Sequence, residues 1–515
     1  MKTLPGTVPT EGEMMMKRNV MGKRICGVLM PVFCLPSPYG IGAFSKEAYE
    51  FVDFLEQAGQ RLWQILPLGP TGYGDSPYQS FSTYAGNPYF IDLEALIKKG
   101  WLTKEECMAC DFGETPDCID YDKIYQMRFA LLRKAYDNSG IESDGGFVEF
   151  CKKNAWWLED YALYMAVKRS FGGASWFFWD EDIKLRKPEA LVAYREKCPE
   201  EIGFYRFEQY LFQSQWFELK AYANQKKIRI VGDIPIYVAA DSADVWAGRE
   251  LFQLAEDGTP KAVAGCPPDF FSATGQLWGN PLYDWDYHKK TDYDWWMKRI
   301  GYCYALYDIL RIDHFRGFDE YYSIPYGDLT AEGGHWEKGP GIDIFETMKR
   351  RLGNKEVIAE DLGFLTDSVI ELVKNSGFPG MKVLQFAFDS REAGNYMPYY
   401  YPENSVVYTG THDNDTIMGW YNSLKEEDKV LAKEYLDIRS NEDIHLVFIR
   451  EALKSVAATA VIPMQDYLAL GSAARINTPS TLGGNWVWRA GKDMFTEELA
   501  GQMRALGKLY GRSGD

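Results

Sequence analysis

The stretch VIAEDLGFLTDSVIELVKNSGFPGMKVLQFAF (residues 357–388) changes from the pattern of a strand to that of a helix and back. A short apolar run at residues 357–359 is followed by Thr366, a typical helix N-cap residue, and by an apolar helical core at residues 369–373. A second apolar run at residues 383–388 predicts another strand. Strands that alternate with helices in this way are typical of α/β folds.

The same alternation extends over most of the chain. Apolar residues between Ala48 and Leu55 recur at helical spacing, and Gly59 supplies a helix stop. Six further strands are expected, at residues 25–30, 62–66, 228–231, 309–312, 406–409 and 457–462. Eight strands, most of them followed by helical patterns, predict a (β/α)8 barrel. A doubly wound sheet is the alternative, but no G-x-G-x-x-G motif follows a strand to support it.

Uneven spacing between the expected strands indicates insertions in the βα loops. Residues 1–24 are expected to form an N-terminal extension, and residues 25–515 the catalytic barrel. A mostly helical insertion subdomain is expected at about residues 73–224, because a loop of that length has structure of its own. Its helical patterns centre on residues 124–136, 156–169 and 207–220. A smaller insertion, rich in Gly, Pro and aromatic residues, is expected at about residues 242–298.

The composition of the 515-residue chain indicates which kinds of molecule the protein can bind. Asp and Glu number 74 against 56 Lys and Arg, which gives a net charge of −18 at pH 7. Such a surplus of acid argues against nucleic acid and against an anionic membrane surface. Aromatic residues make up 15% of the chain, more than a core needs. We therefore expect aromatic side chains in a binding cleft, where the flat apolar faces of sugars are natural partners.

The cysteines and the termini indicate the compartment. Nine cysteines, an odd and scattered set, are typical of reduced thiols in a cytoplasmic protein. Cys107 and Cys110 form the closest pair, but no His lies near them to complete a structural zinc site. The first residues lack the apolar segment of a signal peptide, and no apolar run approaches the ~18–20 residues of a membrane span. A cytoplasmic location is therefore expected.

Acidic residues follow several of the expected strands at their carboxyl ends. Asp233, Asp313, Glu360 and Asp413 each follow a different strand. In a (β/α)8 barrel these ends form the face that carries the chemistry. Two close carboxylates can serve as nucleophile and general acid/base in glycosidic chemistry, and a third can stabilise positive charge on the sugar ring. Burial and mutual repulsion would raise the pKa of one of them, so that it holds a proton at neutral pH.

Other interpretations of the same residues stay open. A single Asp at a strand end often serves as a helix N-cap or turn residue. Arg311 and Asp313 could form an ordinary ion pair, and His314 and His412 could be structural. Three carboxylates and a His could also bind a divalent metal ion. Arg311 and Arg316 stand among these acids and would repel a cation, so neither a metal nor a cofactor is expected.

Longer motifs run through nearly the whole chain from about Cys26 onward. They are LPLGPTGYGDSPY (66–78), GDIPIYV (232–238), PPDFFSATGQLWGNP (267–281), RIDHFRG (311–317), AEDLG (359–363), THDN (411–414), and NTP (477–479) with GNW (484–486). These motifs resemble those of the amylomaltases, the 4-α-glucanotransferase or disproportionating-enzyme family related to the α-amylase group. Because the motifs are long and keep their order, a chance match is excluded.

The resemblance implies a role for each residue of the expected site. Asp313 matches the nucleophile that forms a covalent glycosyl-enzyme, and Glu360 matches the general acid/base. Asp413 matches the carboxylate that binds sugar hydroxyls and favours the oxocarbenium-like transition state. Arg311 matches the residue that orients Asp313 and keeps it ionised, and His412 a donor to the glucose hydroxyls. The other substrate-binding residues implied are Asp233 in the first sugar-site motif, Ser76 and Tyr78 on the donor side, Asp389 in the cleft, and Phe270, Phe271 and Trp278 on an acceptor-side loop.

The implied activity is the retaining transfer of an α-1,4-glucan segment. The donor would be a maltodextrin, and the acceptor the 4-hydroxyl of another glucan or of glucose. The chemistry would need no cofactor. Two other functions use the same residues: an α-glucan hydrolase, and a non-catalytic glucan-binding protein on a degenerate barrel.

Overall fold

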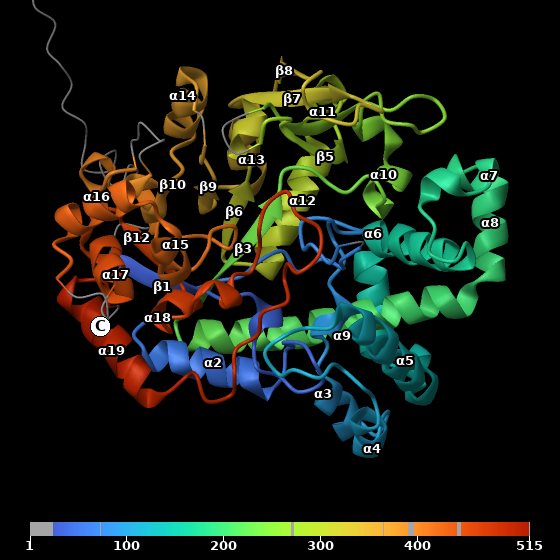
Figure 1. Cartoon of the computed structure of the whole chain (residues 1–515). Coiled ribbons are helices and arrows are strands. Elements are labelled where there is room, and N and C mark those ends of the chain that lie inside the picture. The colour runs from blue at the N-terminus through green and yellow to red at the C-terminus, as the bar shows by residue number, and fades with distance from the viewer. Residues whose placement is uncertain are drawn as a thin grey trace, which may run out of the picture.

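A closed barrel of eight parallel strands forms the centre of the molecule (Figure 1). The computed structural model describes residues 24–513, apart from residues 73, 269–271, 364, 390–395 and 440–443. The barrel strands are β1 (Ile25–Leu29), β2 (Leu62–Gln64), β3 (Arg229–Pro235), β6 (Ile309–Asp313), β9 (Val357–Ala359), β10 (Gly380–Val383), β11 (Ser405–Tyr408) and β12 (Thr459–Pro463). They close in the order β1-β12-β11-β10-β9-β6-β3-β2. The predicted (β/α)8 barrel is confirmed.

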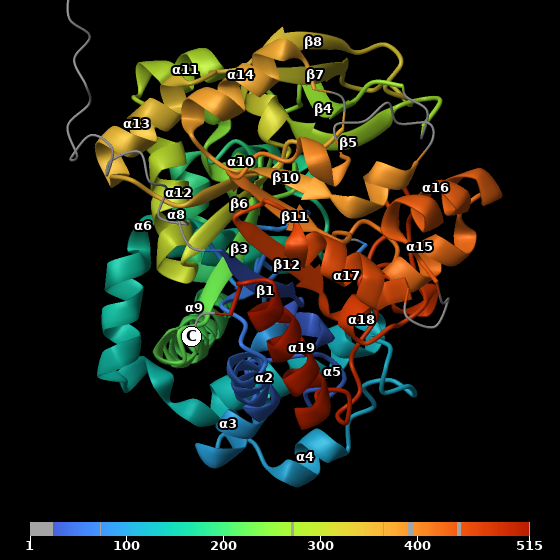
Figure 2. The same cartoon turned by 90° about the vertical axis from the view of Figure 1, so that its left-hand side faces the viewer.

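Helices surround the barrel and cover the apolar outer faces of its strands. The helices next to the strands include α2 (Lys46–Gln57), α9 (Pro199–Gln225), α12 (Asp294–Leu306), α13 (Asp343–Leu352), α14 (Asp367–Ser376), α17 (Ile444–Lys454) and α19 (Glu497–Leu509). Figure 2 shows α9, α2 and α19 beside one another, below β3, β1 and β12. Because both faces of a parallel strand are covered in this arrangement, the strands are almost wholly buried. Thr366 caps α14 as predicted, with its side chain accepting a hydrogen bond from the Val369 N–H.

The sixth predicted strand is wrong in position. Strand β10 is Gly380–Val383, and residues Leu384–Phe388 form a short 3-10 helix, η7. The side-chain amide of Gln385 donates to the carbonyl of Asp415 at 2.7 Å, and its backbone N–H donates to the carbonyl of Thr409 at 3.2 Å. These bonds turn the chain toward the loop after β11. Hydrophobicity alone does not distinguish such a buried turn from a strand.

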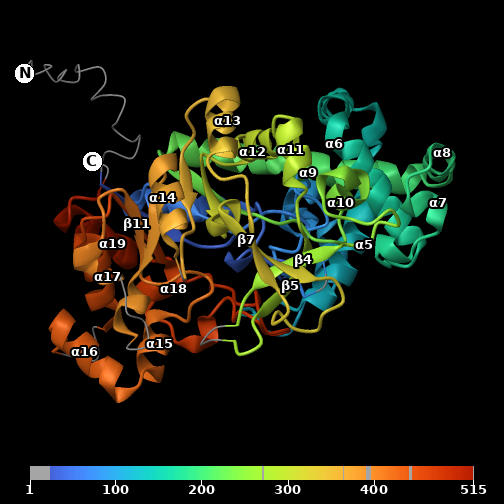
Figure 3. The same ribbon diagram turned by 90° about the horizontal axis from the view of Figure 1, so that it is seen from above.

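Between β2 and β3 the chain forms a set of helices, here named the helical insertion. It contains α3 (Leu93–Lys98), α4 (Lys104–Met108), α5 (Tyr121–Ser139), α6 (Gly145–Ser170), α7 (Glu181–Lys184), α8 (Pro188–Lys197) and the first part of α9. Figure 3 shows α6, α7 and α8 at one end of the molecule and α16 (Glu426–Leu436), α17 and α19 at the other. Helix α9 packs against both α6 and α2, so it joins the insertion to the barrel wall. The predicted boundary at residue 224 lies inside this helix.

A four-stranded antiparallel sheet, which the sequence did not predict, lies above β3 and β6 in Figure 1. Its strands are β4 (Ala262–Cys266), β5 (Gln276–Pro281), β7 (Glu320–Pro325) and β8 (His335–Lys338), in the order β5-β4-β7-β8. Strands β4 and β5 belong to the connection between β3 and β6, and β7 and β8 to the connection after β6. The pairing of β4 with β7 therefore ties two βα connections together at the same end of the barrel.

Shorter helices complete the connections. They are α10 (Ala243–Ala247), α11 (Trp285–Lys290), α15 (Ile417–Ser423) and α18 (Met464–Tyr467). Among the described residues, no helix combines the length and hydrophobicity needed to cross a bilayer. The same residues contain no group of three or more His, Cys, Asp or Glu side chains arranged to hold a metal ion. Cys107 is buried at the end of α4 and Cys110 is half-buried, and both are free thiols.

Candidate active site

The four predicted acids lie at the carboxyl ends of barrel strands. We name this end of the barrel the barrel mouth. Asp233 and Asp313 stand near the ends of β3 and β6, where Asp233 is in register with Arg311. Glu360 directly follows β9, and its backbone N–H bonds the carbonyl of Ile312 on β6. Asp413 follows β11 in the loop that leads to α15. Side-chain interactions link Asp233, Asp313 and Asp413, and backbone N–H groups hold Glu360.

Arg311 connects two of the acids. Its Nη1 lies 2.8 and 2.6 Å from the two carboxylate oxygens of Asp233, and its Nη2 lies 3.0 Å from Oδ1 of Asp313. The side chains of Arg311 and Asp233 are 3% and 0% exposed, whereas that of Asp313 is 28% exposed. Burial raises the pKa of Asp233, Arg311 opposes that rise and Asp313 adds to it. Asp233 thus holds the buried Arg311 guanidinium in place, and this guanidinium also pairs with the more open Asp313 carboxylate.

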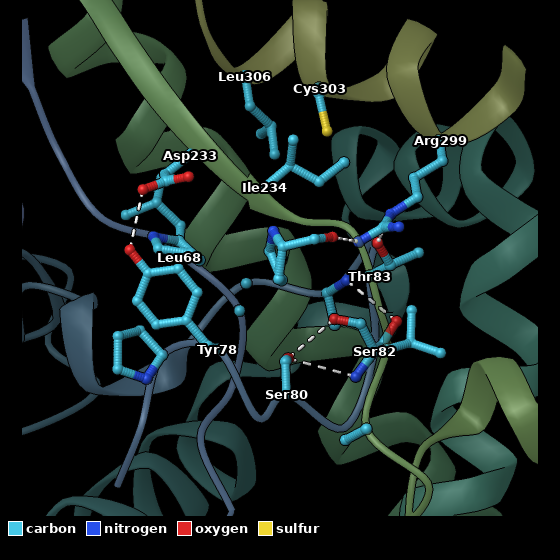
Figure 4. Close-up of a pocket in the computed structure, with 18 of the residues that line it drawn as sticks. Leu68, Tyr78, Ser80, Ser82, Thr83, Asp233, Ile234, Arg299, Cys303 and Leu306 are labelled. Atoms are coloured by element: carbon cyan, nitrogen blue, oxygen red, sulfur yellow. Dashed lines mark hydrogen bonds between the residues drawn. The ribbon is translucent and has the colours of Figure 1, made fainter. Parts of the chain in front are cut away.

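Tyr78 joins Asp233 to the loop after β11. Its hydroxyl donates to Oδ2 of Asp233 at 2.9 Å and lies 2.9 Å from Nε2 of His412 (Figure 4 shows the bond to Asp233). A tyrosine hydroxyl has one proton, so with Asp233 as its acceptor the Nε2 of His412 must be the donor to Tyr78. The two rings stack with centroids 5.3 Å apart and an angle of 17°. The network therefore fixes both the orientation of His412 and its tautomer.

Glu360 is held by backbone donors. The N–H of His314 donates to Oε2 at 2.7 Å, and the N–H of Leu362 donates to Oε1 at 2.9 Å. His314 has a left-handed backbone conformation, with φ of 53°, at the turn after β6. Burial, and next the charge of Asp313, raise the pKa of Glu360 to about 7, while Arg311 and the two N–H donors oppose the rise. Glu360 can therefore hold a proton near neutral pH.

Asp413 is held by a loop near the carboxyl end of the chain. The side-chain amide of Asn477 donates to Oδ1 of Asp413 at 2.6 Å, and Arg475 donates to the Asp413 backbone carbonyl at 2.7 Å. The Nε2 of His412 lies 3.3 Å from Oδ2 of Asp413. Sequence reasoning placed Asn477 in a motif but gave it no role. Its position in that motif was the signal that pointed to a functional contact.

The remaining predicted site residues lie around these acids or in neighbouring segments. Ser76 stabilises the turn before Tyr78, since its hydroxyl accepts the Tyr78 N–H at 3.3 Å. Trp278 lies on β5 with its ring edge-on to His314, at a centroid distance of 4.9 Å. Asp389 directly follows η7 and is half-buried. Phe270 and Phe271 lie outside the described residues.

Arg299 on α12 is a structural support that the sequence did not single out. Its guanidinium donates to the carbonyls of Pro235 and Ile236 at 2.6 and 2.9 Å and to the hydroxyl of Thr83 at 2.6 Å. Figure 4 shows Arg299 and Thr83 at one side of the pocket that also contains Tyr78 and Asp233. Arg299 thereby fixes the end of β3 against the segment after Tyr78. An arginine in an amphipathic helix gives no sequence signal for such a role.

The barrel mouth thus places the Glu360 carboxyl, which can hold a proton near neutral pH, beside the Asp313 carboxylate that pairs with Arg311. A nucleophile must be ionised and a general acid must be protonated, and pairs whose surroundings separate their pKa values are typical of glycosidic sites. The buried guanidinium of Arg311 among these acids disfavours a bound cation. The arrangement suits acid/base and nucleophilic chemistry at a glycosidic bond.

Comparisons with known proteins agree with this geometry. The model of the glycoside hydrolase 77 family, 4-alpha-glucanotransferase, matches residues 30–493. The 4-alpha-glucanotransferase of Clostridium butyricum is 50% identical over 485 residues, which cover 94% of this chain and 100% of that protein. The 4-alpha-glucanotransferase of Thermus thermophilus is 45% identical over 500 residues, which cover 95% and 99%.

Solved structures show the same relationship. An amylomaltase from Streptococcus agalactiae in complex with acarbose has a TM-score of 0.93 and 44% identity, and the match covers 96% of this chain and 100% of that one. The amylomaltase from Corynebacterium glutamicum shares the fold with a TM-score of 0.74 at 18% identity, and the match covers 95% of this chain and 74% of that one. This chain belongs to the 4-alpha-glucanotransferase family of glycoside hydrolase family 77 and is a glycosyl-transferring enzyme.

Proposed function

We propose that this 4-alpha-glucanotransferase passes an α-1,4-glucan segment from a donor maltodextrin to the 4-hydroxyl of an acceptor glucan or glucose. The transfer retains the α configuration and proceeds through a covalent intermediate on Asp313. The observation that carries the proposal is the pair of unlike carboxyl groups, with Asp313 beside the Arg311 guanidinium and Glu360 with a pKa of about 7.

The first step forms the glycosyl-enzyme. One carboxylate oxygen of Asp313 attacks the anomeric carbon as the bond from that carbon to the glycosidic oxygen breaks. Glu360 gives its proton to this oxygen, so the reducing-end part of the donor leaves with a free 4-hydroxyl. Arg311 orients the attacking carboxylate, because its Nη2 lies 3.0 Å from Oδ1 of Asp313.

The second step transfers the segment. Glu360, now a carboxylate, takes the proton of the acceptor 4-hydroxyl, and the acceptor oxygen displaces Asp313 from the anomeric carbon. The two inversions together give retention, the outcome for enzymes whose second carboxylate acts as nucleophile. Glu360 ends each cycle protonated, which returns the site to its starting state.

The remaining residues bind the sugar at the cleavage point. Asp413, held by Asn477, accepts hydrogen bonds from ring hydroxyls and stabilises positive charge on the ring. We assign His412 and Tyr78 to contacts with the same sugar. Transfer rather than hydrolysis requires water to be kept from the intermediate, and we assign that exclusion to Trp278 together with Phe270 and Phe271. We place the enzyme in the cytoplasm on the basis of its scattered, odd cysteine set.

Incubation with maltotriose tests the proposal. A transferase converts maltotriose into glucose and longer maltodextrins, whereas a hydrolase on the same site yields only shorter sugars. Chromatography of the products over time separates the two outcomes. A pool that only shortens would contradict the proposal in favour of the hydrolase, and no conversion at all would favour a glucan-binding protein.

A further inference from the structure

A second pocket lies between the helical insertion and the barrel, away from the four acids. Its walls come from α6, from the segment around Tyr84, from α10 and from the start of α12. It holds about 910 Å³ of space free of protein atoms, open solvent at its mouth included. The enclosed cavity itself is about 290 Å³, at the lower edge of the ~300–1,000 Å³ typical of small-molecule sites. None of the four acids of the barrel mouth lines it.

Trp156 on α6 is the most exposed aromatic side chain in the wall. It is 49% exposed, although tryptophan is usually well covered by protein. Its ring makes edge-on contacts with Tyr84 and Tyr302, at centroid distances of 4.7 and 6.2 Å and angles of 76° in both cases. The ring is therefore held in place while about half of its surface stays open. A fixed, open indole suits a ligand with a flat apolar face.

The polar groups of the wall indicate a neutral ligand. Asp160 pairs with Arg186 at 2.7 Å, and Asp294 pairs with Lys298 at 2.8 Å, so each carboxylate is oriented by a partner. The acidic lining residues are Asp160, Asp244, Glu250 and Asp294, against Lys298 as the basic one. An anionic ligand such as a sugar phosphate would meet this excess of acid. Carboxylates beside aromatic rings, which also include the half-buried Tyr287 and Trp295, suit the hydroxyls and C–H faces of a sugar.

We propose that this pocket is a second, non-reacting binding site for α-glucan chains. The proposal rests on the proposed function, because the ligand is the substrate class of the reaction. Tyr84 lies on the segment that also carries Tyr78, and Arg299 bonds Thr83 between them. A long glucan held here stays close to the barrel mouth, which raises its effective concentration there. Short donors, which cannot reach both places, gain nothing from the pocket.

Titration calorimetry of the Asp313→Asn enzyme with maltoheptaose tests the proposal, since this variant does not consume the ligand. We expect two sites in the parent. Trp156→Ala should weaken one of them about tenfold, equivalent to ~1.4 kcal/mol, and leave the other unchanged. Ala247→Arg fills the pocket from α10 without removing Trp156, so it should have the same effect even if Trp156→Ala proves unstable. Phe178→Ala, which removes an exposed aromatic ring outside the pocket, is the matched control.

Activity measurements distinguish the proposed second binding site from the proposed transferase function. With Asp313 intact, Trp156→Ala should keep the wild-type rate on maltotriose and show a raised KM for amylose. A single maltoheptaose site in the parent, or two unchanged sites in both pocket variants, would overturn the second site and leave the function standing. Saturable binding of tetramethylammonium in place of maltoheptaose would also overturn it, because acids and aromatic rings can hold an organic cation. If the wild-type enzyme does not convert maltotriose, the proposed function is contradicted instead.

Discussion

Two glutamates with raised pKa values, Glu360 at the barrel mouth and Glu208 on α9, stand in opposite surroundings. Glu360 is half-buried, accepts two backbone N–H groups and lies beside Asp313 and Arg311. Glu208 is fully buried, and neither of its carboxyl oxygens has a hydrogen-bond partner among the described residues. Burial raises its pKa well above the usual range.

The contrast shows that a raised pKa does not by itself mark a catalytic acid. At the barrel mouth the proton-holding group is oriented by donors and adjoins a second carboxylate that can act with it. On α9 the raised pKa reflects mainly the cost of removing an unpaired carboxyl group from water. We therefore expect changes at Glu360 to alter activity and changes at Glu208 to alter stability.

The largest effect is expected from Glu360→Gln, which removes the transferable proton and keeps the shape of the side chain. The kcat for maltotriose should fall about 10²–10⁴-fold, the usual contribution of general acid–base catalysis. The melting temperature should change little. Glu208→Gln is the matched variant in the helical insertion and should keep wild-type kcat. Equal activity losses in the two variants would refute the distinction.

The pH dependence of wild-type activity tests the role of Glu360 as the proton donor. Glu360 must be protonated in the first step, and its pKa is about 7. The kcat/KM should therefore fall as pH rises through about 7. In Glu360→Gln the residual kcat/KM should lack this basic limb. A limb that persists in the variant would assign the titration to another group.

A middle-sized effect is expected from Asn477→Ala. The variant removes the amide that orients Asp413, and a hydrogen bond to a charged group contributes ~1.5–3 kcal/mol. The kcat should fall about tenfold or more, with a smaller change in the free energy of unfolding. Asn138→Ala removes a comparable amide bond, to the carbonyl of Trp101 in the helical insertion, and should leave kcat unchanged. Loss of activity in both would indicate a general folding defect.

The smallest effect is expected from Glu208→Met, which should improve the stability of the fold, whereas the variants above should lower activity. This apolar replacement of similar size removes two unpaired oxygens and should stabilise the fold by ~1–3 kcal/mol at pH 7. Its neighbour Gln209 offers a control, because its amide exchanges hydrogen bonds with both backbone groups of Gly86, at 2.7 and 2.9 Å. Gln209→Met should destabilise the fold by a similar amount. Urea unfolding followed by circular dichroism measures both.

The stabilisation by Glu208→Met should depend on pH. The pKa of Glu208 is raised in the folded chain, so the unfolded chain releases this proton first as the pH increases. The contribution of Glu208 to the free energy of unfolding of the wild type is greatest below pH 4.5, the ordinary pKa of a glutamate. This contribution is lost as the pH rises toward the raised pKa of the folded chain. The difference between variant and wild type should therefore grow as the pH rises above 4.5. A constant difference would show that Glu208 is paired in solution.

Much of the fold followed from local patterns, because apolar strands and amphipathic helices are encoded over short stretches. The four acids could also be placed, since a strand end is recognisable and parallel strands end at one face. The sheet formed by β4, β5, β7 and β8 could not be, because its strands are short and pair across two separate connections. The turn at Gln385 depends on hydrogen bonds to a distant loop, which hydrophobicity does not reveal.

The site was predictable in its acids and less so in its supports. Asp313 and Glu360 occupy motifs with a recognisable chemical pattern. Asn477 and Arg299 act through contacts with residues far away in the sequence, which only the folded chain brings together. The isolation of Glu208 is likewise a property of tertiary packing, since a glutamate in a long helix gives no sign of being buried.

Trapping of the glycosyl-enzyme tests the central claim most directly. Glu360→Gln incubated with α-maltotriosyl fluoride can still form the intermediate, because fluoride leaves without a proton donor, but it lacks the base that speeds the second step. Mass spectrometry of the digested protein should then find a maltotriosyl group on the peptide that contains Asp313, and none in the Asp313→Asn, Glu360→Gln double variant. A sugar attached to a different residue, or turnover of the fluoride with inverted product, would contradict the account.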